Sequence, residues 1–234
     1  MKPIAYETRH ARGGVLPTHR HDRPYAALVI DGSYTECSLD GPLICERGTI
    51  VVHPPFHAHG DRFGGHGARV INIDLPATLA AIEATAWRAH DLDEAREVFE
   101  RCPQRLPQLL ECARPAPPSE LSAWQRDLLA LLRESEDDVS ALAKHVGVSA
   151  EHASRAFRRS HGMSPRALRR ESHWRVALTL LHGDRPLAEV AASAGFADQS
   201  HLTRVVQGHT GCTPARLRQQ IKYVQDTRIS CVVQ

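Results

Sequence analysis

The feature that most constrains this chain is an internal repeat in its second half, between Asp138 and Arg218. The segment 142–147 aligns with the segment 190–195 at an offset of 48 residues. After a one-residue insertion the offset becomes 49, and it then holds for Arg155 and Arg204, Gly162 and Gly211, and Pro165 and Pro214. A repeat that keeps its register through glycines and prolines predicts two copies of one structural unit.

Each copy has the local chemistry of two short helices joined by a tight turn. Gly147 and Gly195 lie where an apolar-periodic helix must end, a position that favours a residue able to adopt a positive φ. Ser149 and Asp198 follow, where a side-chain oxygen can cap the next helix. The pattern predicts a helix–turn–helix unit, present twice.

A longer helix is expected to join the two units. Ser164-Pro165 places a hydroxyl at the cap and a proline at the first helical position, and Thr213-Pro214 repeats this arrangement after the second unit. A helix over residues 165–182 spans roughly 25 Å, which with its flanking turns matches major grooves about 34 Å apart. The geometry is typical of DNA binding.

Positive charge is concentrated in the same half. Residues 1–121 carry 13 Lys and Arg against 16 Asp and Glu, whereas residues 122–234 carry 16 against 11. The net charges of the two parts are therefore −3 and +5, which favours a polyanionic partner for the second. The arginines expected to contact DNA phosphates are Arg159, Arg166, Arg169 and Arg170.

The second helix of each unit is a candidate for the DNA major groove, because residues near the N-terminus of such a helix read bases. On the first of these helices, residues 150–160, the outward candidates for DNA contact are Glu151, His152, Ser154, Arg155 and Arg158. On the second, after Asp198, they are Gln199, Ser200, His201 and Arg204. Gln can pair with adenine and Arg with guanine in bidentate fashion.

The first half predicts β-structure. Between Gly13 and Leu75, short apolar runs alternate with turn residues such as Asp31-Gly32 and Asp40-Gly41. Strands of this length at near-regular spacing predict a small β-barrel or sandwich, whose interior is a natural small-molecule pocket.

Two helices and a linker are expected to follow the strands. Residues 77–89 have the spacing of an amphipathic helix, and a second helix is expected to run from a cap at Asp91 or Asp93 through Cys102. The Pro-rich stretch after Cys112 has the composition of a semi-rigid linker. The expected division of this α+β chain is a first domain at 1–112, a linker at 113–119, an all-α domain at 120–220 and a tail at 221–234.

The six cysteines show no CxxC spacing, and because the sequence contains no long apolar run, no signal peptide is expected. Reduced thiols in a cytoplasmic protein without a membrane segment are therefore expected.

Histidines cluster among the predicted strands. His19 and His21 are two residues apart, so on a strand they would point to the same face, and His59 follows a later strand in the same region. Three imidazoles converging on one interior would suit a divalent transition metal such as Zn, Fe, Ni or Cu. The alternative is that these histidines line a pocket for an organic effector or are hydrogen bonded within the domain.

Two family resemblances are carried by these residues. Gly13, His19, His21 and Gly32 meet the first motif of the cupin family, although Tyr25 stands where that family has a metal-binding glutamate. The stretch from Gly195 to Arg204, followed by Gly211-Cys212-Thr213-Pro214 and Arg218, resembles the signature of the AraC/XylS family of bacterial transcriptional regulators.

The resemblance implies a transcriptional regulator, without a catalytic step, whose tandem helix-turn-helix domain binds double-stranded promoter DNA. It further implies that a small molecule or metal bound in a cupin-like N-terminal barrel controls contacts with RNA polymerase, and it is compatible with an activator and with a homodimer.

Three alternatives to this hypothesis remain. One is a metal-dependent cupin enzyme, such as an oxygenase, or a metal sensor fused to the DNA-binding module. A DNA-repair methyltransferase would need a zinc–cysteine cluster that Cys37 and Cys45 alone do not supply. A protein that uses the repeat only for protein contacts fits the basic surface poorly.

Overall fold

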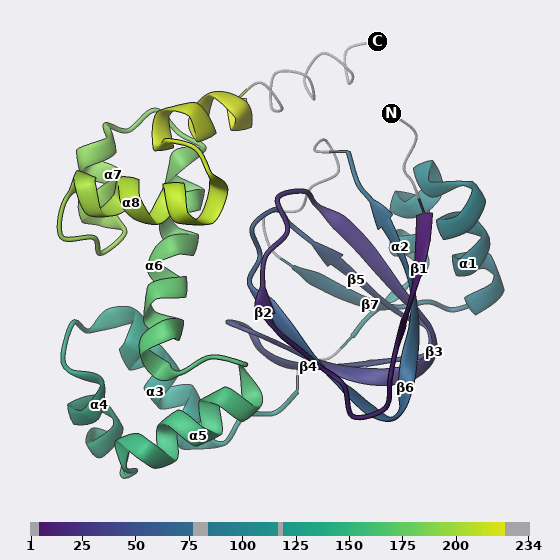
Figure 1. Ribbon diagram of the computed structural model, residues 1–234, viewed down its shortest axis with the longest axis horizontal. Helices are drawn as coiled ribbons and strands as arrows, with labels where there is room; N and C mark the ends of the chain where they lie inside the picture. The colour runs from purple at the N-terminus through teal and green to yellow at the C-terminus, as the bar shows by residue number, and fades with distance from the viewer. Residues whose placement is uncertain (1–4, 77–83, 117–118, 223–234) are drawn as a thin grey trace. The chain divides into compact units, whose positions relative to one another are not determined.

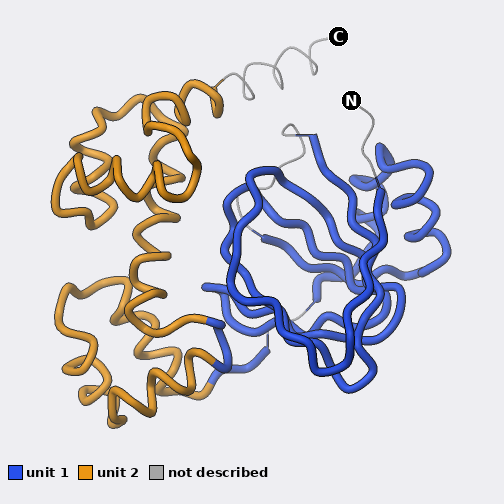
Figure 2. Tube along the Cα trace, viewed as in Figure 1, with its two compact units in different colours: residues 1–121, 159–162 blue, residues 122–158, 163–234 orange. Residues whose placement is uncertain are grey.

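The computed structural model describes residues 5–76, 84–116 and 119–222. The chain forms two compact units, residues 1–121 together with 159–162, and residues 122–158 together with 163–234 (Figure 2). The first unit contains the strands and the second is helical, in agreement with the expected α+β organisation. Among the described helices, none is long and apolar enough to span a membrane.

Eight strands of the first unit form one antiparallel sheet (Figure 1). They are β1 (Ala5–His10), β2 (Val15–His19), β3 (Tyr25–Ser38), β4 (Gly41–Glu46), β5 (Thr49–His53), β6 (His59–Asp74), β7 (Thr85–Arg88) and β8 (Arg114–Pro115). Their order is β1-β6-β3-β5-β7-β8, with β2 also paired to β6 and β4 to β3. The two long strands β3 and β6 therefore organise the whole sheet.

Bends in these two strands curve the sheet around an interior. The β3–β6 register shifts between Val29 and Asp31 and again between Gly32 and Tyr34, and such bulges bend a strand. Gly32 has φ +71°, and a Cβ there would lie 2.1 Å from the carbonyl oxygen of Gly67, so only glycine fits. On one side of the bend β3 pairs with β5, and on the other side with β4.

The sequence predicts a cupin-like β-barrel, but the described strands do not close into one. In the pairing order β1 and β8 are the two ends, and no ladder in the described part of the chain joins them. The physical reason is that β8 is only two residues long and pairs through Arg114 and Pro115 with β7 alone. These two residues belong to the segment expected to be the linker.

Alternation along the strands separates two hydrophobic layers, since successive residues point to opposite faces. One face of β3, with Ala26, Leu28 and Ile30, packs against α1 (Leu92–Arg101) and α2 (Leu106–Cys112) through residues such as Phe99. The short 3-10 helix η2 (Pro103–Arg105) joins these two helices. The other face, with Ala27 and its neighbours, lines the interior.

The predicted helix over residues 77–89 is wrong at its C-terminal end. Residues 77–83 lie outside the described part, but Thr85–Arg88 form β7, which pairs with β5 in the register Ile50 to Trp87. Pairing with the edge of β5 satisfies backbone groups and buries part of Trp87, which outweighs the local helical spacing. The next prediction is confirmed, because Asp91 caps α1 by accepting from the backbone nitrogens of Asp93 and Glu94.

The second unit is built from six described helices and a further helical stretch at 214–222. The helices are α3 (Ala123–Glu134), α4 (Val139–His145), α5 (Ala150–Ser160), α6 (Pro165–Leu181), α7 (Leu187–Ser193) and α8 (Gln199–Thr210). The long helix α6 contacts α3 near one end and α7 and α8 near the other (Figure 1). Trp174 and Leu168, on α6, are fully buried. The tail beyond residue 222 lies outside the described residues.

Candidate nucleic-acid interface and ligand pocket

The two turns of the repeat have the same backbone geometry. Gly147 has φ +80° and Gly195 has φ +77°, so both adopt the left-handed conformation that glycine tolerates. The nitrogen of Val148 donates to the oxygen of Ala143 at 3.0 Å, and 48 residues later the nitrogen of Phe196 donates to the oxygen of Ala191 at 2.9 Å. The two copies of the sequence repeat therefore form the same backbone hydrogen bond at their turns.

Both helices that follow these turns are capped as expected. The hydroxyl oxygen of Ser149 accepts a hydrogen bond from the nitrogen of His152 at 3.1 Å at the start of α5. The carboxylate of Asp198 accepts from the nitrogen of His201 at 2.6 Å at the start of α8. Each cap satisfies a backbone donor that the helix itself leaves without a partner.

The predicted DNA-contact residues of α5 lie on its solvent-facing side. Ala153 and Phe157 are fully buried, which directs the opposite face outward. Ser154 is half-buried and accepts a hydrogen bond from Arg158 at 2.7 Å, so these two predicted contacts also bond to each other. The exposed predicted residues are Glu151, His152, Arg155 and Arg158.

On α8 the arrangement is equivalent. Leu202 and Val206 are fully buried. His201 is half-buried, with its ring edge-on to Phe196 at a centroid separation of 5.2 Å. The exposed predicted residues are Gln199, Ser200 and Arg204.

The predicted phosphate-binding arginines are of two kinds. Arg159 and Arg170 are exposed. Arg166 lies 3.3 Å from the carboxylate of Asp138, and Arg169 donates to the backbone oxygen of Asp137 at 2.8 Å. The side chains of Arg166 and Arg169 are therefore both bonded to the segment that precedes α4.

The interior of the first unit contains a cavity of about 130 Å³. Its lining brings together His19, His21 and His59, the three histidines singled out from the sequence. Their candidate ligand atoms all lie within 4.8 Å of one another. Nε2 of His19 and Nε2 of His21 are 3.1 Å apart.

Backbone contacts orient two of these rings. Nδ1 of His19 donates to the oxygen of Pro17 at 2.9 Å, and Nδ1 of His59 donates to the oxygen of His57 at 3.4 Å. Because a carbonyl oxygen only accepts, the proton of each neutral ring is on Nδ1, and Nε2 carries the lone pair. The hydroxyl of Tyr25 lies 2.9 Å from Nε2 of His59. Tyr25, which stands where the cupin motif has a metal-binding glutamate, therefore contacts one of the candidate metal-binding histidines.

Burial disfavours the charged form of His21, His53 and His59. Burial, followed by the neighbouring histidines, lowers the pKa of His59 to about 2, and the same causes lower the pKa of His53 well below its ordinary value. Burial, and then the charge of His19, lowers the pKa of His21. Neutral imidazoles are the form that binds a metal ion.

The structure places a second group of three buried histidines beside the first, and the two groups share His59. His53, His57 and His59 also bring their candidate ligand atoms within 4.8 Å of one another. Nδ1 of His53 lies 3.3 Å from Nδ1 of His57, and Nε2 of His53 lies 3.4 Å from the carboxylate of Glu36.

Two carboxyl groups in the cavity lining were also missed, Glu36 on β3 and Asp61 on β6. Burial, and then the charge of Asp61, raises the pKa of Glu36 well above its ordinary value, and burial raises the pKa of Asp61 to about 7. The signal that could have found Asp61 is the period of two in His59, Asp61 and Phe63, which places all three on one strand face.

Comparison with known proteins gives results for the second unit. A family model described as a helix-turn-helix domain matches residues 142–220. The arabinose operon regulatory protein of Salmonella typhimurium is 34% identical over 88 residues, which are 37% of this chain and 31% of that protein. The HTH-type transcriptional regulator RipA of Corynebacterium glutamicum is 36% identical over 104 residues, 43% of this chain and 31% of RipA. The chain thus spans about a third of the length of these relatives.

Among solved structures, ToxT from Vibrio cholerae aligns with 94% of this chain and 98% of its own, with a TM-score of 0.43 and 9% sequence identity. This similarity is too distant to transfer a ligand or a function.

Proposed function

We propose that the chain is a sequence-specific transcriptional regulator of the AraC/XylS type that binds promoter DNA through both helix-turn-helix units, because residues 142–220 match a helix-turn-helix family model and the chain aligns in part with transcriptional regulators. The observation that carries the proposal is the repeated turn, cap and exposed polar face of α5 and α8. The proposed function has no catalytic step.

The proposed binding mode inserts α5 and α8 into successive major grooves. The 17 residues of α6 span roughly 25 Å, so with the flanking turns one chain can reach two groove segments about 34 Å apart. Arg155 and Arg204 occupy equivalent places, and each can bind guanine in bidentate fashion. Arg159, Arg166, Arg169 and Arg170 would supply phosphate contacts, which position the protein without reading sequence.

The first unit is proposed to be a cupin-like effector-sensing domain. Its cavity is lined by aromatic and apolar side chains together with a few polar groups, as small-molecule sites are. The effector would control how the chain acts on RNA polymerase in the cytoplasm, as a monomer or as a homodimer.

The test of DNA binding is selection of bound sequences from random duplex DNA by the purified chain at fixed salt. We expect a bipartite site with two elements about one helical turn apart. Arg204→Ala should weaken the base preference in one DNA element, and Arg155→Ala should weaken it in the other. Arg96 is an exposed arginine of the first unit, so Arg96→Ala should change the preference in neither element. Recovery of no sequence above a salt-sensitive background would contradict the proposal.

A divalent transition metal such as Zn, Fe or Ni is a second candidate effector, held by His19, His21 and His59. The residues fit such an ion: two nitrogens that bind one ion at about 2.0–2.1 Å lie roughly 2.9–3.4 Å apart, and the observed Nε2 separation is 3.1 Å. The ion would add fixed positive charge and order these three side chains.

This second candidate is tested by titrating Zn²⁺ and Ni²⁺ into the metal-free protein by calorimetry. His59→Ala should remove binding, whereas His66→Ala, at an exposed position of β6, should not. Equal binding by both variants would contradict the assignment.

A further inference from the structure

The cavity of the first unit contains two facing acidic side chains. Glu36 on β3 and Asp61 on β6 are partners in the strand register, so their side chains lie side by side on the interior face. Glu36 is 3% exposed and Asp61 is 9% exposed. Both line the cavity, so their carboxyl groups border space that a ligand can enter.

Neither carboxyl group has a cationic side chain beside it in the cavity. Within the described residues, Oδ1 of Asp61 has no hydrogen-bond partner, and Glu36 contacts Nε2 of His53 at 3.4 Å. None of the residues that line the cavity is Lys or Arg. Because a buried acidic group without a counter-charge is costly, this pair is a feature that a bound cation would explain.

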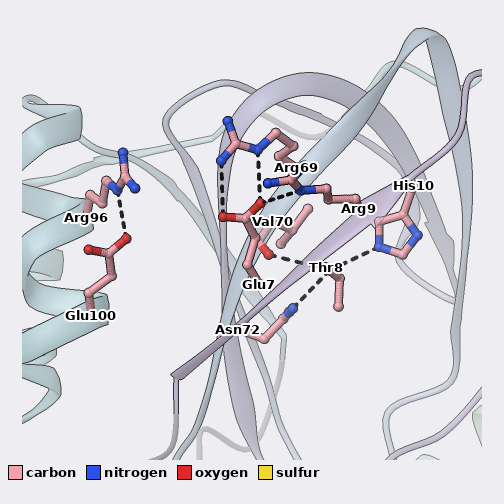
Figure 3. A network of polar contacts seen from close by, with 9 residues as sticks. All are labelled: Glu7, Thr8, Arg9, His10, Arg69, Val70, Asn72, Arg96 and Glu100. Carbon is pink, nitrogen blue, oxygen red and sulfur yellow. Dashed lines mark hydrogen bonds and ion pairs between the residues drawn. The ribbon is translucent and has the colours of Figure 1, made fainter.

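Other groups in the lining also favour a ligand that donates hydrogen bonds. The hydroxyl of Thr8 donates to the oxygen of Val70, and it accepts from the side-chain nitrogen of Asn72 and from Nε2 of His10 (Figure 3). Nε2 of His10 and one hydrogen of the Asn72 amide therefore donate to Thr8 within the wall of the cavity. The carboxylates of Glu36 and Asp61 act as acceptors when ionised.

Aromatic rings border the same space. Tyr34 and Phe63 both line the cavity, with ring centroids 5.5 Å apart, and Phe63 is itself stacked on His10. The faces of such rings attract cations and pack against apolar groups. A volume of about 130 Å³ is close to the roughly 150 Å³ of a cavity that admits benzene, so it has room for about six to eight non-hydrogen atoms.

We propose that this cavity binds a small organic cation, with its ammonium group between Glu36 and Asp61 and its apolar part against Tyr34 and Phe63. The inference rests on the proposed function, since it names the chemical class of the effector that the first unit would sense. An anionic ligand is disfavoured because the lining offers it no fixed positive charge. A neutral polyol lacks the attraction to the acidic pair and is one outcome of the test.

The test compares compounds of one size and different charge. Benzylamine, benzyl alcohol and benzoate are titrated by calorimetry into the full chain at neutral pH with EDTA present, so that no metal ion occupies the histidines. n-Butylamine and n-butanol form a second pair for a narrower cavity. We expect each amine to bind at least tenfold more tightly than its alcohol, and benzoate not to bind. Binding of no amine below about 10 mM, or equal binding of amine and alcohol, would overturn the proposal.

Variants assign the preference to the acidic pair. Asp61→Asn and Glu36→Gln keep the shape of each side chain and remove its charge, so each should reduce the amine-to-alcohol ratio at least fivefold. Asp31→Asn makes the same change at an exposed position of β3 and should leave the ratio unchanged. Binding of the alcohols by each variant reports that the cavity is intact. An unchanged ratio in Asp61→Asn would contradict the assignment.

DNA selection separates this inference from the proposed function. The DNA selection is repeated with and without the amine. If the amine binds but the selected DNA has the same sequence and affinity in both cases, the cation site stands and its role as effector is wrong. If the chain selects no DNA at all, the regulator proposal fails, whatever the amine titrations show.

Discussion

The two turn glycines of the repeat permit a matched test of local geometry. Gly147 and Gly195 both have positive φ, near +80° and +77°. A side chain in this conformation costs roughly 1–2 kcal/mol. A Cβ on Gly147 would meet no atom within 4 Å, so Gly147→Ala should lower the free energy of unfolding by about 1–2 kcal/mol.

Gly195→Ala should cost more, because the new methyl group meets the ring of His173. A Cβ on Gly195 would lie 2.9 Å from Cε1 and 3.0 Å from Nε2 of that ring. The side chain of His173 is 18% exposed, so the ring has little room to move. A displacement of about 30° from its rotamer adds roughly 0.5–1.5 kcal/mol, for a total of about 1.5–3.5 kcal/mol.

Gly208→Ala is a control for which the expected change in stability has the opposite sign. Gly208 lies within α8 without a positive φ, is exposed, and a Cβ there would meet nothing within 4 Å. Gly208→Ala should therefore stabilise the helical unit by about 0.5–1 kcal/mol.

The assay is urea unfolding followed by far-UV circular dichroism, which reports mainly on the helical unit. The three variants should rank Gly208→Ala, Gly147→Ala and Gly195→Ala from most to least stable, with unchanged dependence on urea concentration. A Gly147→Ala variant as stable as the natural chain would refute the argument from φ. A Gly195→Ala variant no less stable than Gly147→Ala would refute the argument from the His173 contact.

Three further predictions concern single side chains. Arg204→Ala should weaken DNA binding by about 1–3 kcal/mol and relax specificity at one base pair, measured by titration of variant sites at fixed salt; equal weakening on every sequence would identify a phosphate contact instead. Asp198→Ala removes the cap of α8 and should cost about 0.5–2 kcal/mol in urea unfolding, whereas Asp198→Asn should cost little. Hydrogen bonds from Arg69 and Arg9 lower the pKa of Glu7 from 4.5 to about 2 (Figure 3), so its contribution to stability is complete above pH 4.5 and lost as pH falls toward 2. Glu7→Gln should thus be less stable than the natural chain near pH 6 and equal to it near pH 2; a difference independent of pH would contradict this.

The sequence by itself determined the helical unit in detail. Helix ends depend on a few adjacent residues, so Ser149 and Asp198 identified the starts of α5 and α8, and Gly147 and Gly195 identified the turns before them. The exposed faces of α5 and α8 followed from helical periodicity for the same reason. Local chemistry was enough because each of these features lies within a few residues along the chain.

Only the tertiary structure decided the strand pairing and the contents of the cavity. Residues 85–88 became a strand because the edge of β5 was available to pair with them, and a two-residue β8 left the pairing order open. Glu36 and Asp61 meet because bulges set the β3–β6 register, and a shift of one residue would have turned either side chain to the other face. Register depends on pairing between segments far apart in the chain, and no local pattern specifies it.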